Sequence, residues 1–159
     1  MSDFDAARAF YRLAYNREDN DCAVRALAVA CTVPYEHARD VLTRVGRPPG
    51  WGVTSEMLMA GIDLLNCSVV KRKVKARTMH TLCRELRRES GGVIALTRSH
   101  VAGFWNGECI DWSRDRFLRI TDVFDITRRC EHNVDTQKVC QVNFVHYVDS
   151  STRQIQTVR

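Results

Sequence analysis

Three residues that lie far apart in the sequence, Cys22, His100 and Asp111, have the side chains of a thiol nucleophile, its base and the acid that orients the base. Cys22 stands at the start of a nearly all-apolar run within NREDNDCAVRALAVAC, residues 16–31. A thiol at a helix N-terminus is readily converted to a thiolate. Packing is the alternative role, because free cysteine is among the most buried residue types. The residues around His100 help to decide between these two interpretations.

The dipeptide Asn106-Gly107 predicts a two-residue β-hairpin turn, for which it is the strongest short-range signal. Such a turn pairs Trp105 with Glu108, and side chains then alternate between the two faces of the hairpin. One face, which we expect to pack on the core, holds Val101, Trp105, Ile110 and Trp112. The other face holds His100, Ala102, Cys109 and Asp111.

On that second face, His100 and Asp111 are predicted to be diagonal neighbours across the strand pair. An aspartate in this position orients one imidazole nitrogen and leaves the other for proton transfer. Taken alone, the two residues also fit a solvated polar pair on a half-exposed sheet. Together with a thiol at a helix start, they favour the arrangement that activates a cysteine nucleophile. Cys109, on the same face, is expected to serve packing.

With these residues identified, the sequence resembles the papain-like cysteine peptidases. The likeness is to the compact microbial and phage-encoded branch, similar to the domains that process bacteriocin leaders. It covers residues 16–112 and rests on three motifs, which are DCAVRAL at 21–27, SHVAG at 99–103 and GECID at 107–111. The resemblance implies a Cys22-His100-Asp111 triad that performs acyl transfer on a protein or peptide substrate without a cofactor.

The resemblance also implies an amide side chain upstream of the nucleophile that helps to bind the oxyanion. Asn16 occupies this position, where relatives usually have Gln, and the backbone N–H of Cys22 is the expected second donor. Asn20 is the competing candidate, and capping the helix is its alternative role. We expect the carboxylate of Asp21 to turn toward the helix N–H groups rather than toward the sulfur.

Helices are predicted before strands, which indicates a single α+β domain over residues 1–159, with N-terminal helices packed against a C-terminal antiparallel sheet as in papain-like proteins. Thr32, Thr54 or Ser55, and Thr78 are the expected caps of the later helices, and Gly46 is the expected end of one. The loop 46–52 carries Trp51, which either lines a substrate groove or covers the core. The predicted helices span 3–14, 21–31, 32–46, 54–65 and 79–89, and the predicted strands span 67–74, 92–98, 99–105, 108–112, 119–126 and 141–148.

The composition is that of an ordinary globular protein, with 45% hydrophobic residues and a net charge of +5 in 159 residues. No apolar stretch is long enough to span a bilayer, so we expect no membrane association and a cytoplasmic location, in the host if the chain is viral. Seven cysteines without a secretory signal are expected to be reduced.

The sequence also contains candidate residues for a metal site and for a nucleic-acid interface. Cys130, His132, Cys140 and His146 fit no common zinc spacing, so no metal site is predicted. The basic segment 71–89 lacks interleaved aromatic residues, so a solvated face is favoured over nucleic-acid binding. A catalytically silent binding module that blocks a host protein and a basic nucleic-acid-binding protein are the alternative functions. The oligomeric state is not predicted.

Overall fold

The computed structural model describes residues 19–129, and the predicted helix 3–14 and strand 141–148 lie outside them. The described helices are α2 (Cys22–Ala30), α3 (Tyr35–Arg44), α4 (Ser55–Leu64), α5 (Met79–Glu85) and the short 3₁₀ helix η1 (Trp112–Asp115). The strands are β1 (Cys67–Lys71), β2 (Gly92–Thr97), β3 (Val101–Trp105), β4 (Glu108–Cys109) and β5 (Ile120–Arg128). Within this part of the chain, no helix is both long and apolar enough to cross a membrane.

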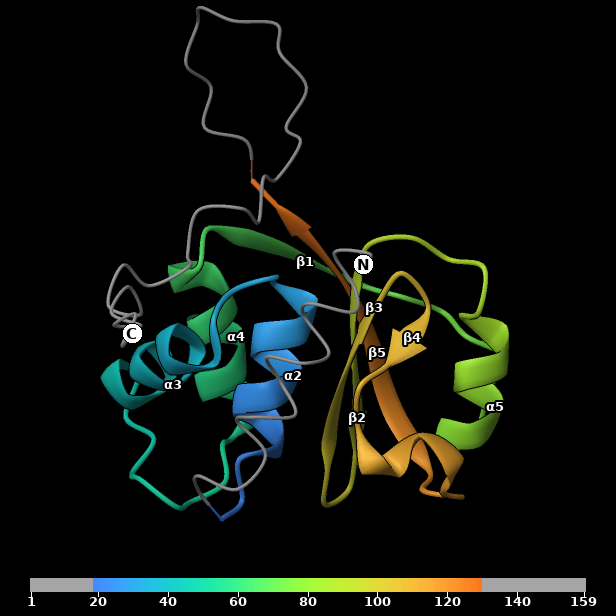
Figure 1. Cartoon of the computed structure of the whole chain (residues 1–159), viewed down its shortest axis with the longest axis horizontal. Coiled ribbons are helices and arrows are strands. Elements are labelled where there is room, and N and C mark those ends of the chain that lie inside the picture. Colours follow the sequence, from blue (N-terminus) through green and yellow to red (C-terminus); the bar gives the residue numbers. More distant parts are fainter. Residues whose placement is uncertain (1–18, 130–159) are drawn as a thin grey trace, which may run out of the picture.

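The strands form one antiparallel sheet in the order β1-β5-β2-β3-β4. Within residues 19–129, three helices precede the first strand and four of the five strands follow α5, so the predicted α+β class is confirmed. Figure 1 shows α2, α3 and α4 on one side of the sheet and α5 on the other. The sheet is therefore a central layer between two helical layers.

Both faces of the sheet are consequently buried, whereas the sequence predicted a core on one face only. Along β2, Ile94 and the half-buried Leu96 pack with α2, α3 and α4, while Val93 and Ala95 pack with α5. This is why the β2 sequence GVIALT reads as a continuous apolar run without alternation. The hairpin face of Ala102 and Cys109, assigned to the site from the sequence, is covered by α5 instead.

Local signals fix the starts of α4 and α5 and the end of α3. Thr54 accepts a hydrogen bond from the Met57 N–H at 3.3 Å, and Thr78 forms a capping box with Thr81. Gly46, at φ +104°, follows the C-cap of α3, as predicted. Thr32 does not cap α3, because its hydroxyl donates to the Cys31 carbonyl and the N-cap is Pro34. The helix predicted over 79–89 ends at Glu85.

Two glycines in the sheet allow α2 to lie directly on its surface. A Cβ on Gly103 would stand 2.5 Å from the carbonyl oxygen of Ala26, and one on Gly92 would overlap the carbonyl of Ala30. Glycine in a strand interior often marks such a close approach of a second backbone. The contact aligns α2 with β3, and this alignment places the start of α2 near the start of β3.

Candidate active site

The hairpin that leads to the site has the predicted register. Trp105 pairs with Glu108 and Phe104 with Cys109. Asn106 and Gly107 have φ of +48° and +77°, as the two-residue turn requires. The Asn106 N–H donates to the Gly91 carbonyl at 3.0 Å, and the Gly91 N–H donates to Asn106 Oδ1 at 2.9 Å. These bonds fix the hairpin tip against the loop that follows α5.

His100 and Asp111 are in contact, with 2.7 Å between His100 Nε2 and Asp111 Oδ2. Both side chains are about 6% exposed. This contact does not arise from the predicted diagonal pairing across two strands. The β3–β4 ladder stops at Cys109, and His100 precedes β3. Asp111 is instead the N-cap of η1, and its Oδ1 accepts a hydrogen bond from the Ser113 N–H at 3.3 Å. The cap holds the second carboxylate oxygen toward His100.

Trp112 covers this pair, although the sequence assigned it to the core. Its ring lies 4.8 Å from the His100 ring at an interplanar angle of 49°, and the Trp112 side chain is largely outside the core, with the residue 43% exposed. The guanidinium of Arg116 lies 4.5 Å from the centre of the Trp112 ring. Trp112 therefore shields one side of the histidine, and Arg116 holds Trp112 by a cation–π contact.

Cys22 is the first residue of α2, as predicted, and it lines the same pocket as His100. Burial raises the pKa of the thiol, but hydrogen bonds from the His100 ring and the Val101 N–H, together with the His100 charge, outweigh burial and lower the pKa below its ordinary value. Because Nε2 of His100 is bound to Asp111, Nδ1 is the nitrogen left for the sulfur. Helix α2 supplies the sulfur, and the segments flanking the hairpin supply the ring and the acid.

The pKa of His100 moves in the opposite direction. Burial lowers it, but the hydrogen bond and charge of Asp111 and those of Cys22 raise the pKa from 6.5 to about 9. A lowered thiol pKa beside a raised imidazole pKa favours the thiolate–imidazolium pair at neutral pH. Such a pair is a ready nucleophile with a proton beside it.

The residues before Cys22 have structural partners that the sequence did not reveal. Asp21 does not cap α2, because its buried carboxylate binds Arg25 at 2.8 Å and accepts a hydrogen bond from the Tyr35 hydroxyl at 3.1 Å. Asn20 also makes no cap, since its side-chain amide donates to the Gly50 carbonyl at 3.0 Å. Asn16 lies outside the described residues.

A pocket of about 380 Å³ opens beside Cys22 and His100. The buried Leu58 lies at its floor. Its walls are formed by residues 52–55, by residues 96–101, and by Thr121 and Asp122 of β5. Trp51 does not cover the core, because it is 69% exposed, and it adjoins the wall residue Gly52 without lining the pocket itself.

Arg47 is a residue of the site region that sequence reasoning missed. It is 1% exposed, its Nε donates to the Trp51 carbonyl at 2.7 Å, and one terminal nitrogen lies 3.4 Å from the Asn20 carbonyl. The side chain thus joins the pocket wall to the segment that precedes Cys22. A single arginine in a loop gives no sequence signal for such burial, because arginine is almost never fully buried.

The residues considered for zinc, Cys130, His132, Cys140 and His146, lie outside the described chain. Within residues 19–129, no group of three or more His, Cys, Asp or Glu side chains is arranged to hold a metal ion. The five cysteines of these residues are free. No family model, no curated protein and no solved structure matches the chain.

Proposed function

We propose that the protein is a papain-like cysteine peptidase that cleaves a peptide or isopeptide bond. The observation that carries the proposal is that Cys22 lines one pocket with His100, whose Nε2 lies 2.7 Å from Asp111 Oδ2. These three residues come from a helix start, the residue before β3 and the N-cap of η1. Their contact beside one pocket provides nucleophile, base and orienting acid in a single place.

In the proposed reaction, the Cys22 thiolate attacks the substrate carbonyl carbon and forms a tetrahedral intermediate. The His100 imidazolium then protonates the leaving amine, the C–N bond breaks, and an acyl-enzyme thioester remains. His100, now neutral, takes a proton from a water molecule as the water attacks the thioester carbonyl carbon. The C–S bond breaks, the substrate's carboxylic acid leaves, and the Cys22 thiolate and the His100 imidazolium are regenerated. Asp111 stabilises the charged ring throughout. The proposed reaction uses only these side chains and water.

The intermediate's oxyanion needs two convergent donors. The Cys22 N–H is suited to this role, because the first N–H groups of a helix have no intrahelical acceptor. Asn16 is the proposed second donor. Asn20 is the weaker candidate, since its amide is already engaged by Gly50. We propose that the exposed Trp51, beside the pocket wall, contacts the substrate chain.

The required thiol is compatible with a reducing compartment, so we place the protein in the cytoplasm, that of the host if the chain is phage-encoded. The phage assignment rests on the resemblance alone.

The first test measures alkylation of each cysteine by iodoacetamide at neutral pH, with peptide mapping by mass spectrometry. His100→Ala is expected to slow alkylation of Cys22 by about tenfold or more, because each unit of thiol pKa changes the thiolate fraction by up to about tenfold. Cys83, which lies outside the pocket at Cys22, serves as the internal control and is expected to keep its rate. An unchanged Cys22 rate in the variant contradicts the proposed pairing.

The second test concerns turnover. A lysate is incubated with the wild-type protein or with its Cys22→Ala variant, and new peptide termini are quantified by mass spectrometry. Termini that form only with the wild type support a peptidase. If Cys22 is activated but no terminus or isopeptide product forms, the peptidase proposal is wrong, and the silent binding module is then favoured.

A further inference from the structure

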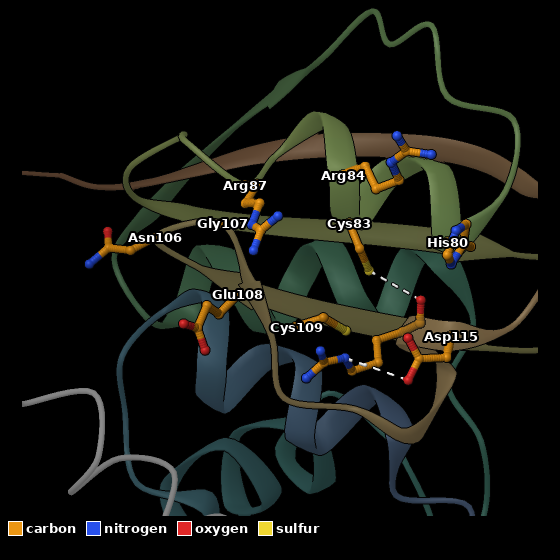
Figure 2. A pocket seen from close by; sticks show the side chains of 10 residues that line it. His80, Cys83, Arg84, Arg87, Asn106, Gly107, Glu108, Cys109 and Asp115 are labelled. Atoms are coloured by element: carbon orange, nitrogen blue, oxygen red, sulfur yellow. Dashed lines mark hydrogen bonds and ion pairs between the residues drawn. The ribbon is translucent and has the colours of Figure 1, made fainter.

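A second pocket lies behind the hairpin, on the α5 side of the sheet. Its volume is about 650 Å³, and it is bounded by α5 and by the segment 106–115. Figure 2 shows side chains from α5 facing those of the hairpin and η1 across this space. None of the three proposed catalytic residues lines it. The pocket therefore is a separate site with its own side chains.

Two thiols line this pocket, Cys83 from α5 and Cys109 from β4. Both are half-buried and face the same pocket, and the Cys83 thiol donates a hydrogen bond to the Arg114 carbonyl at 3.4 Å. Cys31 and Cys67 form another thiol pair, but these residues are only 3% and 1% exposed and belong to the core. Residues 19–129 thus contain one pair of thiols with access to a pocket and one pair that is sealed in the core.

The two pocket thiols differ in reactivity. The hydrogen bond from Cys109 and the positive charge of Arg114 lower the pKa of Cys83, although burial raises it. The same hydrogen bond, with burial, raises the pKa of Cys109. A thiolate attacks a disulfide, whereas a thiol does not. Cys83 is therefore the attacking residue, and Cys109 is placed to act second.

The charged groups around the pair favour an anionic reactant. Arginines come from three positions, and the two carboxylates are those of Glu108 and Asp115. One of these arginines, Arg114, pairs with Asp115. The distance from Arg114 Nε to Asp115 Oδ2 is long, at 3.7 Å, and both side chains are exposed. Exposed pairs of this kind contribute little and are easily exchanged for another partner. The pocket arginines are Arg84, Arg87 and Arg114.

We propose that Cys83 and Cys109 form a thiol–disulfide exchange site that reacts with small anionic disulfides. In the first step, the Cys83 thiolate attacks one sulfur of the reactant RSSR, the reactant S–S bond breaks, and RS⁻ leaves with Cys83–S–SR formed. In the second step, Cys109 loses its proton to solvent and attacks the Cys83 sulfur, which releases the second RS⁻. Overall, the two protein thiols lose two electrons and two protons, and RSSR is reduced to two RSH.

The resulting Cys83–Cys109 bond joins α5 to β4, two residues before Asp111. Gly107 already packs this hairpin tightly against the end of α5, because a Cβ there would overlap the carbonyl of Leu86. The two elements are therefore held together before the bond forms. The site is independent of the proposed peptidase reaction, and its chemistry needs neither Cys22 nor a substrate.

The test uses the full chain with Cys22→Ser, so that the proposed nucleophile does not react. Glutathione disulfide, whose carboxylates make it anionic, is the probe, and peptide mapping locates every new disulfide. We expect a Cys83–Cys109 disulfide, with Cys31 and Cys67 remaining reduced in the folded protein. The additional change Cys109→Ser is expected to trap glutathione on Cys83. The alternative change Cys83→Ser is expected to leave Cys109 largely unreacted.

The charge preference has a separate readout. The rates at which the protein reacts with glutathione disulfide and with the cationic disulfide cystamine are measured. Each rate is divided by the rate at which the same disulfide reacts with an uncharged cysteine amide, a small model thiol. The normalised ratio is expected to favour the anionic probe by about threefold to tenfold at low salt, and Arg87→Gln is expected to reduce it. A mixed disulfide that forms mainly on Cys109, no Cys83–Cys109 bond, or equal reaction of Cys31 overturns the pair as a site. A ratio near one overturns its preference for anions.

Discussion

Replacement of Asp111 by Asn tests the charge relation on which the proposed site depends. The substitution keeps the size of the side chain and an oxygen that accepts a hydrogen bond, but it removes the negative charge 2.7 Å from His100 Nε2. The hydrogen bond to Asp111 is the largest of the interactions that raise the His100 pKa, and the Asp111 charge raises it further. We therefore expect the pKa of His100 to fall in the variant.

The expected size of the fall follows from the site. The pKa of His100 stands at about 9 rather than 6.5, and Cys22 supplies the rest of the increase. An opposite charge in direct contact shifts a pKa by about 1 to 3 units, so we expect a fall of about 1 to 2 units in the variant. Near pH 8, this fall reduces the protonated fraction of His100 from about 90% to about 50% or less.

The assay compares alkylation of Cys22 by iodoacetate and iodoacetamide across the pH range. A protonated His100 attracts the anionic reagent, so the ratio of the two rates reports the charge of the ring beside the sulfur. In the wild type, this ratio is expected to decline around pH 9, where His100 loses its proton. In Asp111→Asn, the decline is expected about 1 to 2 pH units lower.

Asp122→Asn is the matched control, because Asp122 is a carboxylate that lines the pocket beside Cys22 and His100 but pairs with Lys71 at 2.5 Å. The charge of Asp122 is not among the interactions that shift the pKa of His100. The control variant is expected to keep the decline near pH 9. If the two variants give the same profile, or if Asp111→Asn leaves the ratio unchanged, the assigned contact between acid and histidine is refuted.

Three further predictions concern the residues that position the site. Gly103→Ala places a Cβ 2.5 Å from the Ala26 carbonyl oxygen. This overpacking is expected to lower the free energy of unfolding, measured by urea denaturation, by about 1 to 3 kcal/mol and to slow alkylation of Cys22. Unchanged stability contradicts the close approach. Arg47→Met leaves the Trp51 carbonyl without its buried donor, with an expected loss of about 2 kcal/mol, and equal stability refutes the role of Arg47 in joining the segments. Trp51→Ala is expected to change stability by less than about 0.5 kcal/mol while lowering kcat/KM for any substrate identified, and unchanged kcat/KM refutes the proposed substrate contact.

Sequence signals were sufficient where a short segment determines its own geometry. Asn106-Gly107 requires positive φ at two consecutive residues, and this alone fixes the Trp105–Glu108 register. Thr54 and Thr78 cap helices through bonds to residues three positions away. The start of α2 at Cys22 has no such cap and follows from the change from polar to apolar residues after Asp21.

The sequence failed where the determining contact is distant. The alternation rule placed Asp111 in a strand, but the ladder ends at Cys109, and the acid reaches His100 as a helix cap. The same rule placed Trp112 on the core face of the hairpin, whereas its partners are His100 and Arg116. The Asp21 carboxylate binds the side chains of Arg25 and of Tyr35, fourteen residues away, rather than the N–H groups of the helix that it precedes. Strand pattern and capping preference contain no information about such partners.

The spacing between the sulfur and the imidazole depends on how α2 lies along β3. Four residues of α-helix rise about 6 Å, and two residues of strand rise about 6.6 Å, so the two backbones advance together. Ala26 lies on Gly103, and Ala30 lies on Gly92, which pairs with Trp105. One helical step before Ala26 is Cys22, and one strand step before Gly103 is Val101, whose N–H helps to lower the pKa of the Cys22 thiol.

Small residues at this interface therefore have a chemical consequence. A larger side chain at Gly103 or Gly92 forces the helix axis away from the sheet, because the overlapped atoms belong to backbone and not to a flexible side chain. The displacement moves Cys22 away from both the Val101 N–H and the His100 ring, which together lower its pKa. The same glycines that allow the helix to pack on the sheet thus set the distance on which the thiolate depends.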